Sequence, residues 1–101
     1  MKDITVEELK YKIDQKEQFL LLDVREPHEY EAYNIGAKLI PLGNLPTALR
    51  DLESHKESEV IIHCRSGARS ASAKQFLVQA GFKDVKNLLG GMLDWKEKID
   101  V

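Results

Sequence analysis

Three apolar runs along the chain predict buried strands. Residues 19–24 (FLLLDV) are almost wholly apolar, which is typical of a parallel strand covered on both faces. A β-branched run occupies residues 60–62, and Val85 is the apolar centre of residues 83–88. Shorter strands are expected at residues 3–5 and 38–40. The pattern therefore predicts about five strands.

Apolar residues at helical spacing separate these strands. Val6, Leu9 and Ile13 give the first helix one buried stripe, and Thr5 with Glu8 has the spacing of a capping box. Further short helices are expected to begin at Pro27, at Leu45, after Ser70 and near Gly91, the last packing Met92, Leu93 and Trp95 against the sheet. Alternating strands and helices predict an α/β fold with a mainly parallel central sheet and helices on both faces.

Composition limits the classes of function. The 101 residues include 15 basic and 17 acidic side chains, interspersed, and the net charge of −2 gives no reason to expect binding to nucleic acid or to a membrane. No apolar run approaches the ~20 residues that a bilayer span needs, and the first residues show no apolar leader. One cysteine excludes an internal disulfide and fits a reducing compartment. We expect one cytoplasmic domain.

The only cysteine, Cys64, follows the strand at residues 60–62, where the segment CRSGARS leads into a helix. We call residues 64–70 the cysteine loop. Gly67 allows the loop a positive φ, and unpaired N–H groups at a helix N-terminus favour a thiolate in front of them. Arg65 and Arg69 flank the sulfur, so its pKa should fall below the ordinary value of about 8.5. Successive N–H groups of a curled loop also form a site for anions. We therefore predict a reactive cysteine.

The cysteine loop resembles the active-site loop of the rhodanese family of sulfurtransferases. Three other stretches resemble motifs of that family, namely residues 23–30 (DVREPHEY), 34–42 (NIGAKLIPL) and 90–95 (GGMLDW). The four stretches come in the family's order and span nearly the whole chain. The resemblance implies a doubly wound rhodanese fold of about five strands, formed by residues 1–101 as a single rhodanese-like domain. Many rhodaneses have Gly-His-Ile-Pro-Gly-Ala where this chain carries Tyr33 and Asn34, so a slightly altered rim is expected.

The resemblance implies sulfur transfer through a persulfide on Cys64. The thiolate attacks the sulfane sulfur of a donor such as thiosulfate, sulfite leaves, and cyanide or a thiol accepts the outer sulfur. The expected anion-binding residues of the cysteine loop are Arg65, Ser66, Gly67, Ala68, Arg69 and Ser70, with N–H groups aimed at the sulfur. Arg65 is the candidate for meeting the donor. Arg69 either does the same or pins the loop through an ion pair, and Ser70 either bonds the sulfur or caps the helix.

Asp23 and Arg25 lie at the carboxyl end of the strand at residues 19–24, the edge where open α/β sheets bind ligands. A supporting role is favoured, with Asp23 accepting backbone hydrogen bonds and Arg25 pairing with an acid such as Glu29. His63 should point away from the sulfur and pack, because strand side chains alternate. A lone cysteine with scattered histidines lacks a zinc ligand set, so no metal or cofactor is expected. Gly90 and Gly91 should let the backbone approach the cysteine loop closely.

There are three alternatives to this function. Phosphatases and arsenate reductases of related fold hold five residues between cysteine and arginine, whereas Cys64 and Arg69 enclose four, which suits one sulfur better than a tetrahedral oxyanion. A non-catalytic interaction module would be expected to have lost Cys64. The main alternative is a persulfide carrier that delivers sulfur to a protein partner in cofactor or RNA thiolation. Its chemistry at Cys64 would be the same, with a different donor and acceptor.

Overall fold

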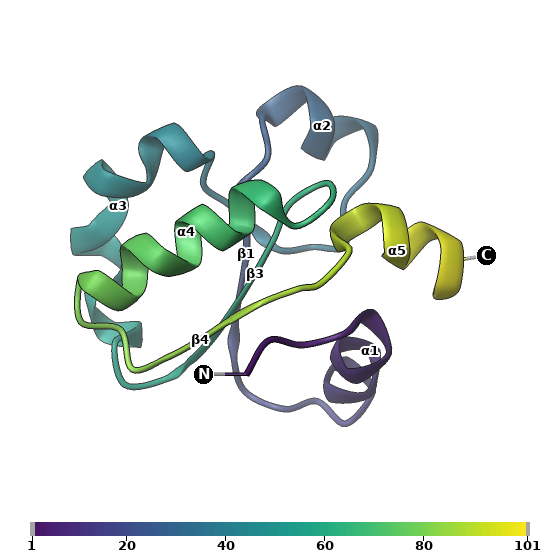
Figure 1. Cartoon of the computed structure of the whole chain (residues 1–101), viewed down its shortest axis with the longest axis horizontal. Coiled ribbons are helices and arrows are strands. Elements are labelled where there is room, and N and C mark those ends of the chain that lie inside the picture. The colour runs from purple at the N-terminus through teal and green to yellow at the C-terminus, as the bar shows by residue number, and fades with distance from the viewer. Residues whose placement is uncertain (1, 101) are drawn as a thin grey trace.

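A parallel β-sheet forms the centre of the computed structural model, which describes residues 2–100 (Figure 1). Within those residues the sheet has four strands in the order β2-β1-β3-β4. They are β1 (Leu20–Asp23), β2 (Lys38–Leu39), β3 (Glu59–His63) and β4 (Asp84–Asn87). The predicted strand at residues 3–5 is reduced to one parallel bridge between Ile4 and Leu88. The α/β class is confirmed, and the approximate count of five strands becomes four and this bridge.

Helices cover both faces of the sheet, as predicted. They are α1 (Val6–Asp14), α2 (Pro27–Ala32), α3 (Leu45–Leu52), α4 (Ala68–Gln79) and α5 (Gly91–Lys98), with 3-10 turns at Leu42–Asn44 and Glu53–His55. One apolar cluster joins the sheet to α3 and α4, and a second joins it to α1 and α5. Figure 1 shows these two pairs of helices on opposite sides of the strands. Among residues 2–100, no helix is long and apolar enough to cross a membrane.

The sequence of β3 explains why this strand is central. Val60 and Ile62 join the cluster beneath α3 and α4, whereas Ile61 joins the cluster beneath α1 and α5. All three side chains are fully buried, and burial of each contributes roughly 1.5–3 kcal/mol. Both edges of β3 are paired, with β1 on one side and β4 on the other. The strand that leads to Cys64 is therefore held on both faces and at both edges.

The predicted helices are present, but two side chains that were expected to be buried are exposed. The capping box is confirmed, since the Thr5 N–H donates to Glu8 at 2.9 Å and the Glu8 N–H donates to Thr5 Oγ1 at 3.2 Å. Ile13 is 38% exposed, because the apolar stripe of α1 reaches solvent at the last turn of the helix. Leu93 is 43% exposed, because Met92 and Trp95 take the inward positions of α5 and Leu93 lies about 100° round the helix from Met92. Those two packing predictions were wrong.

Three helices begin at one edge of the sheet. The paired strands β1, β3 and β4 run parallel, so their carboxyl ends lie at the same edge. From these ends the chain continues into α2, α4 and α5, in that order. Their N-termini therefore gather around the cysteine loop, which Figure 1 shows between the three helices.

Candidate active site

Cys64 lies between the end of β3 at His63 and the start of α4 at Ala68. Gly67 is the N-cap of α4 and has φ 111°, a left-handed conformation that glycine adopts at little cost. The tight turn at Gly67 starts the helix earlier than predicted. Arg69 and Ser70, which were expected to close the loop, therefore belong to the first turn of α4.

Hydrogen-bond donors surround the sulfur of Cys64. The N–H of Gly67 lies 3.1 Å from Sγ, the N–H of Ser70 lies 3.4 Å from it, and the Ser70 hydroxyl lies 3.3 Å from it. Burial raises the pKa of the Cys64 thiol, but hydrogen bonds from the Ser70 hydroxyl and from the N–H groups of Ser70, Gly67 and Ser66 outweigh burial, so this pKa falls below its ordinary value. The leading cause is thus hydrogen bonding rather than the charges of Arg65 and Arg69. The exposed Ser66 contributes through its backbone and not through its hydroxyl.

Ser70 bonds the sulfur and does not cap the helix, which separates the two roles that the sequence left open. Its hydroxyl lies close to Sγ, 3.2 Å from the carbonyl oxygen of Gly67 and 2.5 Å from Oδ1 of Asn87. Asn87 is buried at the end of β4, and its Nδ2 donates to the same Gly67 carbonyl at 3.2 Å. That bond orients the amide so that Oδ1 faces the Ser70 hydroxyl and competes with Sγ of Cys64 for its single proton. Sequence reasoning missed Asn87, although it lies two positions after Val85 and therefore on the same buried face of the strand.

Arg69 forms an ion pair with Glu29 of α2. Nη1 and Nη2 of Arg69 donate to the two carboxylate oxygens at 2.7 and 2.8 Å. The hydrogen bond from Arg69 outweighs partial burial and lowers the pKa of Glu29 to about 2. Of the two roles considered for Arg69, the structure contains the ion pair, which ties the first turn of α4 to α2.

Arg25 pairs with Asp23 rather than with Glu29, which corrects the predicted partner. Its Nη2 and Nε lie 2.7 and 3.0 Å from Asp23 Oδ2, and its backbone N–H donates to Oδ1 at 3.0 Å. Asp23 is the last residue of β1 and Arg25 lies two positions beyond it, so the arginine side chain turns back toward the end of its own strand. Arg25 also donates to the carbonyl of Tyr33 at 2.7 Å. Both side chains are buried, and the pair fixes the end of β1 to the turn after α2.

His63 is fully buried, and its ring nitrogens have no hydrogen-bond partner among residues 2–100. Its Nδ1 lies 4.0 Å from Asp23 Oδ1. Burial lowers the pKa of His63 to about 4 even though the Asp23 carboxylate opposes that shift. The ring is therefore neutral near pH 7 and packs in the core, in line with the sequence prediction.

The first turn of α5 holds the cysteine loop from outside. The N–H of Met92 donates to the carbonyl of Cys64 and the N–H of Leu93 to that of Arg65, both at 3.0 Å. A Cβ on Gly91 would lie 2.5 Å from the Cys64 carbonyl oxygen, so only glycine fits this approach. The predicted close contact is confirmed at Gly91, whereas a Cβ at Gly90 would meet the side chain of its own helix at Asp94. The two backbone donors were not foreseen, because they depend on how α5 docks.

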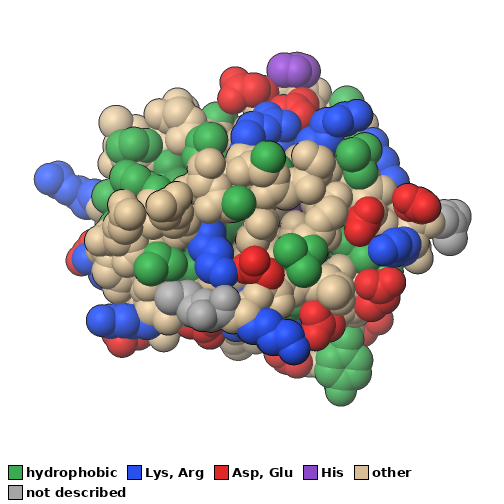
Figure 2. Space-filling view, viewed as in Figure 1, with side chains coloured by type: hydrophobic (Ala, Val, Ile, Leu, Met, Phe, Trp, Pro, Cys, Tyr) green, Lys and Arg blue, Asp and Glu red, His purple; other side chains and the backbone are tan. Residues whose placement is uncertain are grey.

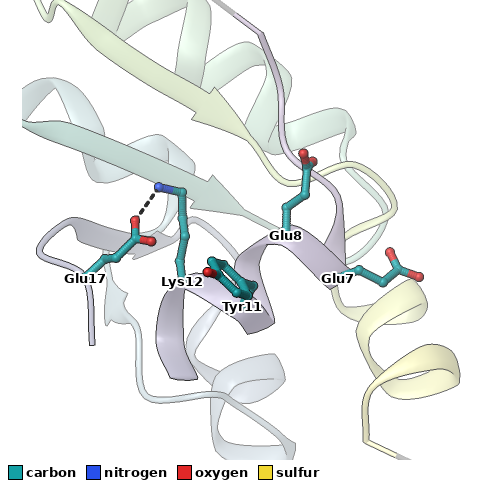
Figure 3. A pocket seen from close by; sticks show the side chains of 5 residues that line it. All are labelled: Glu7, Glu8, Tyr11, Lys12 and Glu17. Carbon is teal, nitrogen blue, oxygen red and sulfur yellow. Dashed lines mark hydrogen bonds and ion pairs between the residues drawn. The ribbon is translucent and has the colours of Figure 1, made fainter. Parts of the chain in front are cut away.

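Two hollows on the surface differ in their relation to the cysteine loop. A pocket of about 190 Å³ lies beside the loop, with Arg65 in its wall. In Figure 2, Lys and Arg side chains lie around α2 and toward α5 with Asp and Glu side chains among them. A wider hollow of about 440 Å³ is lined by Tyr11, Lys12 and three glutamates of α1 and the following turn (Figure 3). It contains no cysteine or histidine, and nowhere in residues 2–100 do three His, Cys, Asp or Glu side chains form a metal-binding group.

The chain is similar to known proteins along nearly its whole length. The model of the rhodanese-like domain family matches residues 5–98. The putative sulfur carrier protein YrkF of Bacillus subtilis is 39% identical over 99 residues, which cover 97% of this chain and 52% of YrkF. The putative sulfurtransferase YtwF of the same species is 38% identical over 97 residues, which cover 95% of this chain and 91% of YtwF.

The fold is also found among solved structures. A rhodanese-like domain protein from Staphylococcus aureus superposes with a TM-score of 0.84 at 36% sequence identity, covering 94% of this chain and 91% of that one. The chain spans about half the length or less of several curated relatives that it matches, with 52%, 24% and 36% of three of them covered.

Proposed function

Because the chain belongs to the rhodanese-like family, which its match over residues 5–98 shows, we propose that it is a sulfurtransferase that carries sulfur as a persulfide on Cys64. The observation that supports this most directly is the set of donors around Sγ. Two N–H groups and one hydroxyl lie within 3.4 Å of the sulfur, and all are fixed by the turn at Gly67. Such fixed donors stabilise a thiolate before reaction and an anionic persulfide after it.

The first step loads the sulfur. The Cys64 thiolate attacks the sulfane sulfur of a donor, for example thiosulfate. A new S–S bond forms while the S–S bond of thiosulfate breaks, and the electron pair leaves with sulfite. The negative charge of the thiolate remains on the outer sulfur of the persulfide, so no proton or oxidant is needed. Covalent catalysis thereby divides one transfer into two easier steps.

The second step unloads the sulfur. An acceptor such as cyanide attacks the outer sulfur, the S–S bond of the persulfide breaks, and the thiolate of Cys64 returns. Only 1% of the Cys64 surface is exposed, so only an atom that projects from the donor or acceptor can reach the sulfur.

A persulfide carrier for a protein partner is the second candidate. Leu89 and Leu93 are 47% and 43% exposed. Both leucines lie next to the cysteine loop. The N–H of Leu93 donates to the Arg65 carbonyl. Leu89 precedes Gly90, whose nitrogen would lie 3.7 Å from a Cβ on Gly67. Apolar side chains beside a reactive loop suit contact with another protein. The name of YrkF as a sulfur carrier protein supports the same proposal.

Intact-protein mass measurement tests both candidates. The native chain and Cys64→Ala are incubated with thiosulfate or with a cysteine-derived persulfide, and cyanide is then added. We expect the native chain alone to gain one sulfur atom, which cyanide removes. Loading by the persulfide but not by thiosulfate would favour the carrier. No gain from either donor, while the thiol stays reduced and reacts with an alkylating agent, would overturn sulfur transfer at Cys64.

A further inference from the structure

Asn87 is a buried polar side chain with no part in either step of the proposed sulfur transfer. It ends β4, and only 6% of its surface is exposed. The side chains of Ser70 and Cys64 beside it are buried as well. Burial of an amide is costly unless its oxygen and its nitrogen both find hydrogen-bond partners. The partners of Asn87 therefore indicate what the residue does.

The side-chain amide of Asn87 has a fixed orientation. Its Nδ2 donates to the carbonyl oxygen of Gly67 at 3.2 Å, and its Oδ1 lies 2.5 Å from the hydroxyl oxygen of Ser70. The reverse orientation would place Oδ1 against the Gly67 carbonyl, and two acceptors cannot bond each other. Oδ1 is therefore held as an acceptor that faces Ser70.

The backbone around Asn87 keeps this amide in place. The Asn87 N–H donates to the carboxylate of Asp3 at 2.9 Å, and its carbonyl accepts from the N–H of Ile4 at 3.1 Å. The next N–H along the chain, that of Leu88, donates to the carbonyl of Ile62 in β3 at 2.9 Å. The acceptor is thus attached to the sheet and keeps its position whatever the charge on the sulfur.

The single proton of the Ser70 hydroxyl has several acceptors within reach. The hydroxyl oxygen lies 2.5 Å from Asn87 Oδ1, 3.2 Å from the carbonyl oxygen of Gly67 and 3.3 Å from Sγ of Cys64. Oδ1 is the nearest of these, so it holds the proton while the sulfur carries no charge. A thiolate attracts the proton more strongly, because hydrogen bonds to ionised groups are roughly twice as strong as neutral ones. The charge on Sγ therefore determines which way the hydroxyl points.

We propose that Asn87 is a positioning residue for sulfur transfer, which holds the Ser70 proton while Sγ of Cys64 is uncharged and releases it to the sulfur when the charge returns. This inference rests on the proposed function. The free thiolate carries its charge on Sγ, whereas the persulfide carries it on the outer sulfur. The hydroxyl therefore faces Sγ in the unloaded protein and Asn87 in the loaded one.

This arrangement supplies a donor at the moment when the sulfur is unloaded. An acceptor attacks the outer sulfur, the S–S bond of the persulfide breaks, and its electron pair returns to Sγ of Cys64. The Ser70 hydroxyl then turns about its own C–O bond toward the growing charge, and no proton passes from one atom to another. Because Asn87 keeps the hydroxyl beside the sulfur throughout, the donor is in place before the charge develops.

A double-mutant cycle on the unloaded protein tests the competition between Asn87 and the sulfur. The pKa of Cys64 is read from the thiolate absorbance and from the pH profile of alkylation by iodoacetamide. Ser70→Ala should raise this pKa by about one unit in the otherwise native chain and by about two units in Asn87→Ala, where Oδ1 no longer shares the proton. In Asn87→Asp the carboxylate retains the proton, so Ser70→Ala should change the pKa little.

Asp3→Ala is the matched control, because it removes a bond to the backbone of Asn87 and leaves the side-chain amide intact. Ser70→Ala should still raise the pKa of Cys64 by about one unit in that background. An effect of Ser70→Ala in Asn87→Ala that is no larger than in the native chain would overturn the inference, since loosening of the turn alone would weaken every donor. If urea unfolding shows that Asn87→Ala is not folded, the isosteric Asn87→Asp decides, and an undiminished effect of Ser70→Ala there would overturn the inference.

The cycle needs no sulfur donor, so its result is separate from that of the loading experiment. If the cycle fails while thiosulfate or a persulfide adds one sulfur atom to Cys64, the role of Asn87 is overturned and the proposed function stands. If neither donor adds sulfur to the reduced thiol, the proposed function fails, and the part of Asn87 in sulfur transfer fails with it.

Discussion

Ser70→Ala would remove a single oxygen atom from the surroundings of the thiolate. The Ser70 hydroxyl lies 3.3 Å from Sγ of Cys64, and it is the side-chain donor that contributes to the lowered pKa of that thiol. The N–H groups of Gly67 and Ser70 keep their places, because they belong to the backbone of the turn. The substitution therefore tests how much one hydroxyl contributes to the acidity of the cysteine.

The size of the effect follows from the strength of one hydrogen bond. A hydrogen bond to a charged group contributes about 1.5–3 kcal/mol, and about 1.36 kcal/mol corresponds to one pKa unit, so complete loss would raise the pKa of Cys64 by about one to two units. Ser70 also lies 2.5 Å from Asn87 Oδ1, which competes for the same proton. We therefore expect the lower end, a rise of about one unit.

The rate of persulfide formation should change less than the thiolate population. Below both pKa values, a rise of about one unit makes the thiolate about tenfold rarer. A more basic thiolate is also more nucleophilic. With a Brønsted coefficient of about 0.4–0.5, each thiolate reacts about threefold faster, which offsets part of the loss in thiolate population. The rate should then fall by about threefold at a pH below the native midpoint.

The assay uses the ultraviolet absorbance of the thiolate, which only one residue of this chain can give because Cys64 is the only cysteine. Ser66→Ala is the matched control, since Ser66 is exposed and acts on the sulfur through its N–H group. The reasoning would be refuted by an unchanged midpoint in Ser70→Ala, or by an equal shift in Ser66→Ala. Urea unfolding of each variant verifies that the fold is retained.

Three further substitutions test the supports of the loop. The carboxylate of Glu29 has a pKa of about 2 instead of 4.5, so its ion pair stabilises the fold fully above pH 4.5 and less as pH falls toward 2. Glu29→Gln should remove this pH dependence of stability, which melting temperatures measured against pH would show. Gly91→Ala should destabilise the protein more than Gly36→Ala in urea, because both positions have positive φ but only Gly91 faces a carbonyl oxygen at 2.5 Å from an added Cβ. Asp23→Ala leaves Arg25 buried without its carboxylate and should cost about 3–5 kcal/mol of unfolding free energy, with urea unfolding as the measurement.

Local sequence was enough to predict the cysteine loop. Cys64 follows a β-branched run directly, and Gly67 permits the turn that begins α4, so a few consecutive residues determine where the sulfur lies. The helix begins three residues earlier than predicted, because Gly67 is the N-cap and no side chain caps the helix. Such errors concern the end of an element and leave its position in the fold unchanged.

Contacts between distant residues could not be predicted in the same way. Glu29 and Arg69 are 40 residues apart in the chain, and Ser70 and Asn87 are 17 apart, so each pair depends on how helices dock. For Arg25 the sequence offered several acids, and geometry selected the nearest, Asp23. Charge and size identify candidates for a pair, but only packing determines which candidates meet.

The docking of α5 has a consequence for the acidity of the sulfur. In a trans peptide, the carbonyl and the following N–H point in opposite directions. The Leu93 N–H holds the Arg65 carbonyl outward at 3.0 Å, and the same peptide plane therefore turns the N–H of Ser66 inward, where it lowers the pKa of Cys64. Helix α5 thus influences the acidity of Cys64 without contacting the sulfur. Any partner or ligand that shifts α5 would rotate that plane and change the fraction of ionised thiol.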